Sequence, residues 1–325
     1  MDLIEKMRAG SQQALARLIT LVEQEDPETP QILKEIYPYL GKAYTVGITG
    51  PPGAGKSTLT SRLTAVLREK GYSVGIIAAD PTSPFSGGAV LGDRIRMQEH
   101  FLDEKVFIRS MATRGSHGGL PSTTPGVVKL MDAFGMDYII VETVGVGQTE
   151  LEIMETADTT VLVLVPEAGD TIQTMKAGIF EIADVFVVNK ADRPGADEMV
   201  TELTNMLHIS PRKEWWDTPV VATQAVNNIG IDKLYESIQG HRCAMQDTSR
   251  LAKRRKEQRR KEFIQTVEER TKRGLWQLIE SDDRLTPYLE KVEAGAIDPY
   301  SAAMDLLSNG DILKDWTART LRVRR

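Results

Sequence analysis

Apolar runs and helical periodicities alternate along the chain between residue 44 and about residue 245. Seven short apolar runs are candidate strands: 44–49, 73–79, 105–109, 138–142, 160–165, 184–188 and 218–222. Several are apolar throughout, as expected where helices cover both faces of a parallel sheet. Helical patterns lie between them, for example at 56–70, 123–134 and 196–207. The pattern predicts an α/β fold with a doubly wound, mostly parallel sheet.

The two ends of the chain carry helical patterns without strands. Residues 1–40 have apolar positions at helical spacing, and Gly41 follows them. Beyond about residue 247, three helices are predicted, at roughly 250–280, 284–293 and 299–308. The first is long for a helix packed within one small domain, so we expect an arm that packs against another subunit.

These patterns predict three parts. The first is a helical extension at residues 1–41, the second is the α/β domain at 42–246, and the third is a helical dimerisation arm at 247–325.

Composition narrows the class of protein. The 325 residues are 41% apolar, enough for a substantial core, and the net charge is −6. No run approaches the roughly 18–20 apolar residues of a bilayer span, and the N-terminal residues show no signal-peptide pattern. The single cysteine, Cys243, excludes an internal disulfide and a cysteine-cluster metal site. We expect a soluble cytoplasmic protein with no membrane partner.

The stretch Arg250–Lys261 holds eight basic residues and one acidic residue. Nucleic-acid binding is one interpretation, but no aromatic residues interleave with the charges, and the whole chain is acidic. A solvated helix face or an acidic partner surface explains the stretch better, so we expect no nucleic-acid partner.

The segment Gly50-Pro51-Pro52-Gly53-Ala54-Gly55-Lys56-Ser57 matches the phosphate-binding pattern G-x-x-x-x-G-K-[ST] at every fixed position. It lies between a predicted strand and a predicted helix, whose N-terminus favours negative charge. The glycines let backbone N–H groups turn toward phosphates, and Lys56 reaches the β- and γ-phosphates. The Ser57 hydroxyl is the predicted Mg²⁺ ligand, and Thr58 joins the nucleotide-binding set.

A second motif specifies the base. Asn189-Lys190-Ala191-Asp192 follows an apolar strand and matches the N-K-x-D pattern of guanine-specific GTPases. The Asp192 carboxylate can accept hydrogen bonds from guanine N1–H and the N2 amine, whereas adenine has no donors there. Asn189 holds the loop, and the Lys190 stem covers the base. The predicted ligands are therefore GTP and GDP with Mg²⁺.

Strand-end carboxylates are candidates for Mg²⁺ and switch functions. Asp80 ends a predicted strand and can hold Mg²⁺, although an aspartate before a proline also forms turns. Asp93 follows a glycine-rich loop that suits a mobile switch or an ordinary solvated loop. Glu142 occupies the acidic position of a D-x-x-G element, and the Gly145 N–H would contact the γ-phosphate. Which of the three carboxylates binds Mg²⁺ directly stays open. Val146 stands where small signalling GTPases carry a water-orienting Gln, and Gln148 is displaced.

Together these segments closely resemble the MeaB/ArgK group of GTPases, which includes the human methylmalonic aciduria type A protein. The resemblance rests on the segments Gly50–Ser57, Asp80–Pro84, Glu142–Gln148 and Asn189–Asp192, and it extends to Met111–Gly115 and Asp298–Ala303. The glutamate-first switch Glu142-Thr143-Val144-Gly145-Val146-Gly147-Gln148 is its most specific part.

The resemblance implies a G domain of the signal-recognition/MinD branch and a homodimer formed by C-terminal helices. It implies a chaperone that gates adenosylcobalamin delivery to an acyl-CoA mutase and protects or reactivates that mutase. A third switch falls on Glu167–Lys176, where Asp170, Gln173 and Lys176 match the polar positions that face the mutase. The base-packing residues are Ala222 and Thr223, although Thr223 departs from the Ser-Ala of many GTPases. His117 also looks unusual for the family, and we assign it no role.

Other interpretations remain open. The partner is predicted to be methylmalonyl-CoA mutase, with an isobutyryl-CoA-type mutase as the alternative. A metallochaperone GTPase of the same branch usually carries Cys/His ligand clusters, whereas this chain has one Cys and four scattered His. An ATP-driven transport component or a kinase conflicts with the guanine motif, and Pro51 stands where dimeric ATPases of the branch carry a second lysine.

Overall fold

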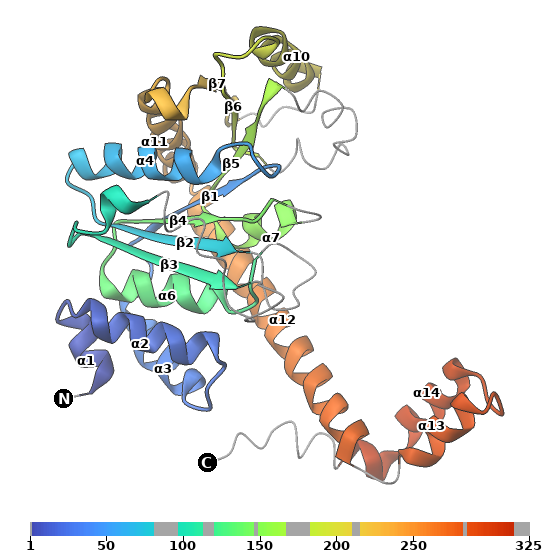
Figure 1. Ribbon diagram of the computed structural model, residues 1–325. Coiled ribbons are helices and arrows are strands. Elements are labelled where there is room, and N and C mark those ends of the chain that lie inside the picture. The colour runs from blue at the N-terminus through green and yellow to red at the C-terminus, as the bar shows by residue number, and fades with distance from the viewer. Residues whose placement is uncertain are drawn as a thin grey trace. The chain divides into compact units, whose positions relative to one another are not determined.

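The computed structural model describes residues 2–80, 97–112, 120–145, 149–166, 183–209, 215–281 and 285–314 (Figure 1). The chain divides into two compact units, Met1–Arg255 and Lys256–Arg325.

The first unit is built on one parallel sheet. Within the described residues its strand order is β3-β2-β4-β1-β5-β6-β7, and every neighbouring pair runs parallel. The strands are β1 (Tyr44–Thr49), β2 (Val74–Asp80), β3 (Val106–Ala112), β4 (Tyr138–Glu142), β5 (Thr159–Leu164), β6 (Val185–Asn189) and β7 (Val220–Thr223). Each overlaps one of the seven predicted runs, which confirms the doubly wound parallel sheet. Parallel strands all end at the same edge, and the order reverses at β1, where ligands bind in this class of fold.

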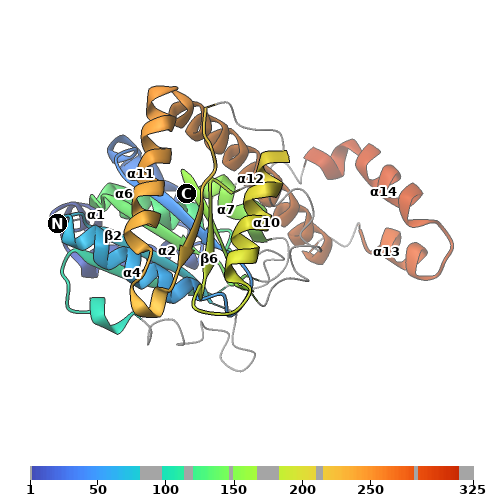
Figure 2. The same ribbon diagram turned by 90° about the horizontal axis from the view of Figure 1, so that it is seen from above.

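Helices cover both faces, as Figures 1 and 2 show. One face carries α4 (Lys56–Glu69), α10 (Ala196–Ile209) and α11 (Ile231–Asp247), and the other carries α6 (Thr124–Phe134) and α7 (Thr149–Thr156). Adjacent strand residues alternate between the two cores, because successive side chains point to opposite faces. Ile76 lies in the first core and Ile77 in the second.

The helices that precede the sheet extend the second core. They are α1 (Leu3–Arg8), α2 (Gln12–Glu23) and α3 (Thr29–Ile36), and they pack on α6. Gly126 allows this close packing, because a Cβ there would lie 2.8 Å from the Val22 side chain. The Asp132 carboxylate accepts backbone N–H bonds from Lys42 at 3.0 Å and from Ala43 at 2.8 Å, which fixes the entry to β1. The three-part division at residues 41 and 246 stays a prediction, while the compact unit that holds the sheet ends at Arg255.

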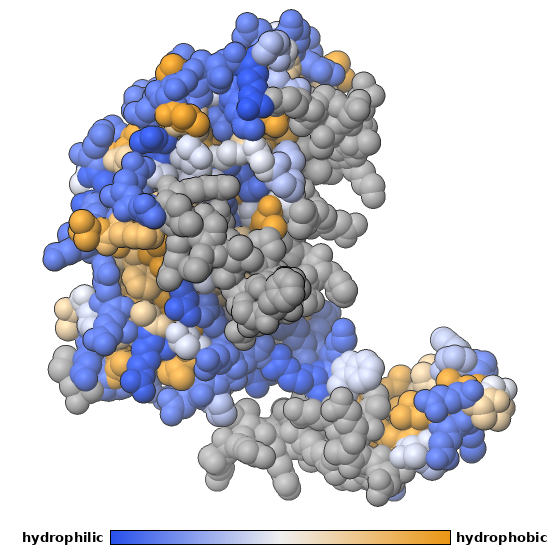
Figure 3. All heavy atoms as spheres, in the orientation of Figure 1, coloured by the Kyte–Doolittle hydropathy of each residue, from blue (hydrophilic) through white to orange (hydrophobic). Residues whose placement is uncertain are grey.

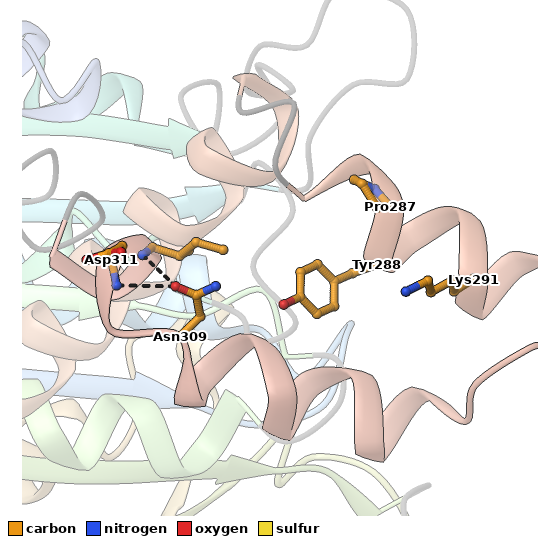
Figure 4. Close-up of a pocket in the computed structure, with 6 residues that line it drawn as sticks. Pro287, Tyr288, Lys291, Asn309 and Asp311 are labelled. Carbon is orange, nitrogen blue, oxygen red and sulfur yellow. Dashed lines mark hydrogen bonds between the residues drawn. The ribbon is translucent and has the colours of Figure 1, made fainter.

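The second unit is helical. The long helix α12 (Arg250–Ser281) enters it, and α13 (Thr286–Glu293) and α14 (Pro299–Ser308) follow. Leu285 and Ile312 form its small core with Tyr288 and Leu306. Four large apolar residues of α13 and α14 are exposed: Leu289, Tyr300, Met304 and Leu307. Figure 3 shows hydrophobic surface, in orange, over this pair of helices. A shallow cavity of about 510 Å³ lies beside Tyr288 and Lys291, and Asn309 caps the backbone N–H groups of Asp311 and Ile312 there (Figure 4). The residues that line it include none of the predicted nucleotide-binding residues.

Among the described residues, no helix combines the length and the apolar character that crossing a membrane requires.

Candidate nucleotide-binding site

The phosphate-binding loop connects β1 to α4, as its sequence predicts. Gly50, Gly53 and Gly55 have positive φ angles of 143°, 75° and 89°, which glycine adopts without steric cost. Two of these positions also have no room for a side chain. A Cβ at Gly50 would collide with the Val163 carbonyl of β5, and one at Gly55 would collide with the Asn189 amide. Gly50 therefore packs against β5, and Gly55 packs against Asn189 at the end of β6.

The Lys56 side chain folds back over this loop. It is buried, with 7% of its surface exposed. Its ammonium donates to the carbonyl oxygens of Gly50 at 3.0 Å, Pro51 at 3.2 Å and Val144 at 3.4 Å. The positive charge thus lies at the mouth of the loop, beside the N-terminus of α4, where both the cation and the helix dipole attract phosphate.

Glu142 and Ser57 meet across the sheet edge. Glu142 ends β4, the strand next to β1, and only 2% of its surface is exposed. One carboxylate oxygen accepts the Ser57 hydroxyl at 2.6 Å, and the other accepts the Thr60 hydroxyl at 2.9 Å. Hydroxyl and carboxylate oxygens are the protein ligands that Mg²⁺ takes beside phosphates, so this pair fits the cation. The carboxylate meets both hydroxyls because α4 presents residues three apart on one face.

The segment after Glu142 lies against the phosphate-binding loop. The Thr143 hydroxyl pairs with that of Thr49 at 2.9 Å, which ties the segment to the end of β1. Gly145 has a φ of 84°, and a Cβ there would lie 2.5 Å from the Lys56 ammonium and would collide with the Gly50 carbonyl. The predicted γ-phosphate sensor is therefore packed so closely on the loop and its lysine that no side chain fits there.

Asn189 joins the guanine motif to the phosphate-binding loop. Its side-chain amide donates to the Ala54 carbonyl at 2.8 Å. Its amide oxygen accepts the Thr223 hydroxyl and the Ala225 N–H, both at 3.1 Å. One buried side chain thus connects the loop after β1, the end of β6 and the loop after β7.

The rest of the guanine motif turns away from the core. Lys190 takes the left-handed conformation, with φ at 56°, and the Ala191 N–H donates to the Thr223 carbonyl at 3.0 Å. Asp192 is exposed at this loop, where a base can reach it. Ala222 is exposed nearby, whereas Thr223 is fully buried and gives its hydroxyl to Asn189. Thr223 therefore holds the guanine motif in place through hydrogen bonds from inside the core.

Several predicted residues lie outside the described part of the chain. They are Asp93, Val146, Gln148 and the three residues predicted to face the mutase, Asp170, Gln173 and Lys176. Asp80 is described in its backbone, which pairs with Ala112 at the end of β3. Sequence reasoning missed Thr60, although its position three residues after Ser57 on a predicted helix was an available signal.

The described residues contain no cluster of three or more His, Cys, Asp or Glu that could hold a metal ion. A nucleotide-bound Mg²⁺ needs no such cluster, because phosphates and water supply most of its ligands.

Known proteins resemble this chain over nearly its whole length. The family model described as methylmalonyl Co-A mutase-associated GTPase MeaB matches residues 15–279. A putative GTPase of Pyrococcus abyssi is 51% identical over 93% of this chain and 94% of its own length. The mouse methylmalonic aciduria type A homolog, a mitochondrial protein, is 34% identical over 92% of this chain and 76% of its own length. A crystal structure of a LAO/AO transport system kinase has a TM-score of 0.70 and 29% identity, and the match covers 94% of this chain and 95% of that one.

These matches confirm the resemblance that the motifs indicated, and the described site supplies the phosphate-binding loop and guanine motif that such enzymes need. The chain belongs to the MeaB family of methylmalonyl-CoA mutase-associated GTPases, and it is an enzyme that hydrolyses GTP to GDP with Mg²⁺.

Proposed function

We propose that this GTPase is a chaperone of an adenosylcobalamin-dependent acyl-CoA mutase, with methylmalonyl-CoA mutase as its first candidate. It would gate cofactor loading and protect or reactivate the mutase in the cytoplasm. The family match and the mouse relative support the choice of partner. The observation that carries the proposal is the close packing of Gly145 on the phosphate-binding loop, where a Cβ would lie 2.5 Å from the Lys56 ammonium. This packing supports a role for the segment as a sensor of the γ-phosphate.

The site residues have distinct proposed roles. Lys56 stabilises the charge on the β- and γ-phosphates, and the backbone of the loop orients them. Ser57 would hold Mg²⁺, with Glu142 at its side, and Asp80 and Asp93 are the further candidate ligands. The bound cation neutralises charge that develops on the phosphates. Asp192 selects guanine. Asn189 holds the guanine motif next to the phosphate-binding loop through its hydrogen bond to Ala54.

Slow hydrolysis by the isolated protein follows from this assignment. Val146 stands where a water-orienting Gln would be, so the enzyme alone lacks a residue at that position to align the attacking water. A bound mutase would order the switch segments and stimulate turnover. Asp170, Gln173 and Lys176 are the proposed contacts, since their spacing of three residues would put them on one face of a helical turn.

The test compares GTP hydrolysis with and without the purified mutase. The triple substitution Asp170→Ala, Gln173→Ala and Lys176→Ala should leave GTP binding nearly unchanged and abolish the stimulation by mutase. The matched control is Asp232→Ala, Lys233→Ala and Glu236→Ala, three exposed residues of α11. An unchanged stimulation factor in the first variant would remove the segment from the mechanism. Running the assay with an isobutyryl-CoA-type mutase distinguishes the two candidate partners.

We also propose that the C-terminal helices form a homodimer. On α12, Phe263 is 69% exposed and Val267, one turn later, is 48% exposed. Large apolar side chains at that spacing form one face of the helix, and their exposure fits a surface that another subunit covers.

A further inference from the structure

Two hydroxyls of the same helix hold the Glu142 carboxylate, and only one of them belongs to the phosphate-binding motif. Ser57 donates to one carboxylate oxygen at 2.6 Å, and Thr60 donates to the other at 2.9 Å. All three side chains are buried: Thr60 is fully buried, Ser57 is 5% exposed and Glu142 is 2% exposed. Hydrogen bonds to an ionised group are stronger than neutral ones, and burial strengthens them further.

The second hydroxyl matters because of how a carboxylate moves. The last side-chain torsion of glutamate is broad and poorly defined, so a single hydrogen bond leaves the carboxylate plane free to turn. A donor on each oxygen fixes that plane. Thr60 is also a stiff donor, since its branched Cβ restricts the first side-chain torsion in a helix.

The orientation of Glu142 in turn determines that of Ser57. A hydroxyl has one proton and two lone pairs, so a serine that gives its proton to a carboxylate can use its oxygen to ligate a cation. Groups that accept a hydrogen bond from a metal ligand orient that ligand and raise its affinity for the metal.

We propose that Thr60 is a positioning residue for Mg²⁺: by fixing the Glu142 carboxylate, it keeps the Ser57 hydroxyl directed at the cation. This role rests on the proposed assignment of Ser57 and Glu142 to the Mg²⁺ site. It adds a residue that lies outside the fixed positions of the phosphate-binding pattern.

The experiment measures the binding of a fluorescent GDP analogue to the full chain while Mg²⁺ is titrated, and again in EDTA. Thr60→Val keeps the shape of the side chain and removes the hydroxyl. It should raise the Mg²⁺ concentration at half-effect about tenfold, a typical loss when a group supporting a metal ligand is removed. Nucleotide affinity in EDTA should stay within about twofold of wild type, because the phosphate-binding loop itself is intact.

Two further variants separate positioning from packing. Thr60→Ser restores the donor and should return the Mg²⁺ midpoint to near the wild-type value. Thr64→Val makes the same change one turn later, at a residue that is equally buried but donates to the Thr60 carbonyl at 2.7 Å. It should leave the Mg²⁺ midpoint unchanged.

The outcomes are distinct. A Thr60→Val protein with a wild-type Mg²⁺ midpoint would overturn the role of Thr60 while the Mg²⁺ assignment stands. Wild-type protein whose GDP binding ignores Mg²⁺ would overturn the assignment itself, and the role of Thr60 with it. If Thr60→Val loses GDP binding in EDTA as well, Thr60→Ala replaces it and is judged by the same two readings.

Discussion

The guanidinium of Arg255 donates two hydrogen bonds to the carboxylate of Asp158, from Nε at 2.9 Å and from Nη2 at 2.6 Å. Asp158 is buried immediately before β5, and it also accepts the Thr45 N–H of β1 at 2.9 Å. Arg255 reaches further, to the Gly41 and Ala43 carbonyls at 3.0 and 2.7 Å. The hydrogen bond with Asp158 raises the pKa of the guanidinium. Arg255, the last residue of the first unit, thus connects the first turns of α12 to the residues before β1 and β5.

Removing this anchor should destabilise the first unit. Arg255→Ala leaves a buried carboxylate without its cation, which costs about 3 kcal/mol, or a fall of roughly 6–12 °C in Tm for a unit of this size. Lys256→Ala, at the exposed next position, should change stability by less than about 0.5 kcal/mol. Thermal unfolding followed by circular dichroism makes the comparison. Equal Tm values for the two variants would show that the contact contributes little.

The same part of the structure shows where sequence reasoning stops. The strands, the phosphate-binding loop and the guanine motif were predictable because hydrophobic period and motif spacing are local properties of the chain. The basic stretch was interpreted as a solvated face or an acidic partner surface. Six of its eight basic residues are exposed, as a solvated face requires. The other two were not anticipated as internal contacts: Arg254 pairs with buried Asp184 at 3.0 Å, and Arg255 pairs with Asp158.

Such pairs join residues 70 and 97 positions apart, and no local pattern encodes which aspartate meets which arginine. The supporting role of Thr223 has the same origin, because it depends on β6 and β7 lying side by side. The motifs could therefore be located from the sequence, and the roles assigned to their residues stay predictions, whereas the contacts that hold the motifs in place required the fold.

Tyr44 should make the protein sensitive to alkali. Burial raises the pKa of its phenol, and the hydrogen bond between the Tyr44 and Thr159 hydroxyls offsets this only in part. A raised pKa in the folded state means that stability is complete below the unfolded pKa of about 10 and is lost as pH rises above it. Above pH 10 the free energy of unfolding should therefore fall less steeply with pH in Tyr44→Phe than in wild type, by up to about 1.4 kcal/mol per pH unit. Urea unfolding at pH 8 through 11 measures the free energy of unfolding of both proteins. Equal dependence on pH in wild type and Tyr44→Phe would contradict the prediction.

Asp192 should determine the choice of base. In Asp192→Asn the amide replaces an acceptor with a donor, so GDP affinity should fall about a hundredfold through the loss of two charge-assisted hydrogen bonds. Xanthosine diphosphate, which has an oxygen in place of the guanine amine, should bind the variant better than GDP does. Asp197→Asn makes the same change in charge at an exposed position of α10 and is the control. Wild-type protein that binds ADP as tightly as GDP would refute the assignment.

The exposed face of α12 should mediate self-association. Phe263→Asp places a charge on that face and should raise the dissociation constant of the dimer about tenfold or more. This corresponds to the free energy that is lost when one aromatic side chain is no longer buried. Gln265→Asp, two residues away and so on the opposite side of the helix, should leave association unchanged. Sedimentation velocity over a micromolar concentration series measures both variants. A wild-type chain that stays monomeric throughout would exclude the dimer.

Gly145 should be essential for hydrolysis and dispensable for GDP binding. A Cβ at this position would lie 2.5 Å from the Lys56 ammonium and would collide with the Gly50 carbonyl. Gly145→Ala must therefore move the segment away from the phosphate-binding loop, where its N–H would contact the γ-phosphate. We expect GTP turnover to fall at least about tenfold, the loss of roughly one hydrogen bond to a charged group. GDP lacks the γ-phosphate, so its affinity should change by less than about threefold.

Gly135→Ala is the matched control, because Gly135 also has a positive φ, of 104°, but a Cβ there meets no atom within 4 Å. That variant should lose some stability from backbone strain and keep its turnover. Equal turnover in the two variants would mean that Gly145 has a conformational role only and does not sense the γ-phosphate.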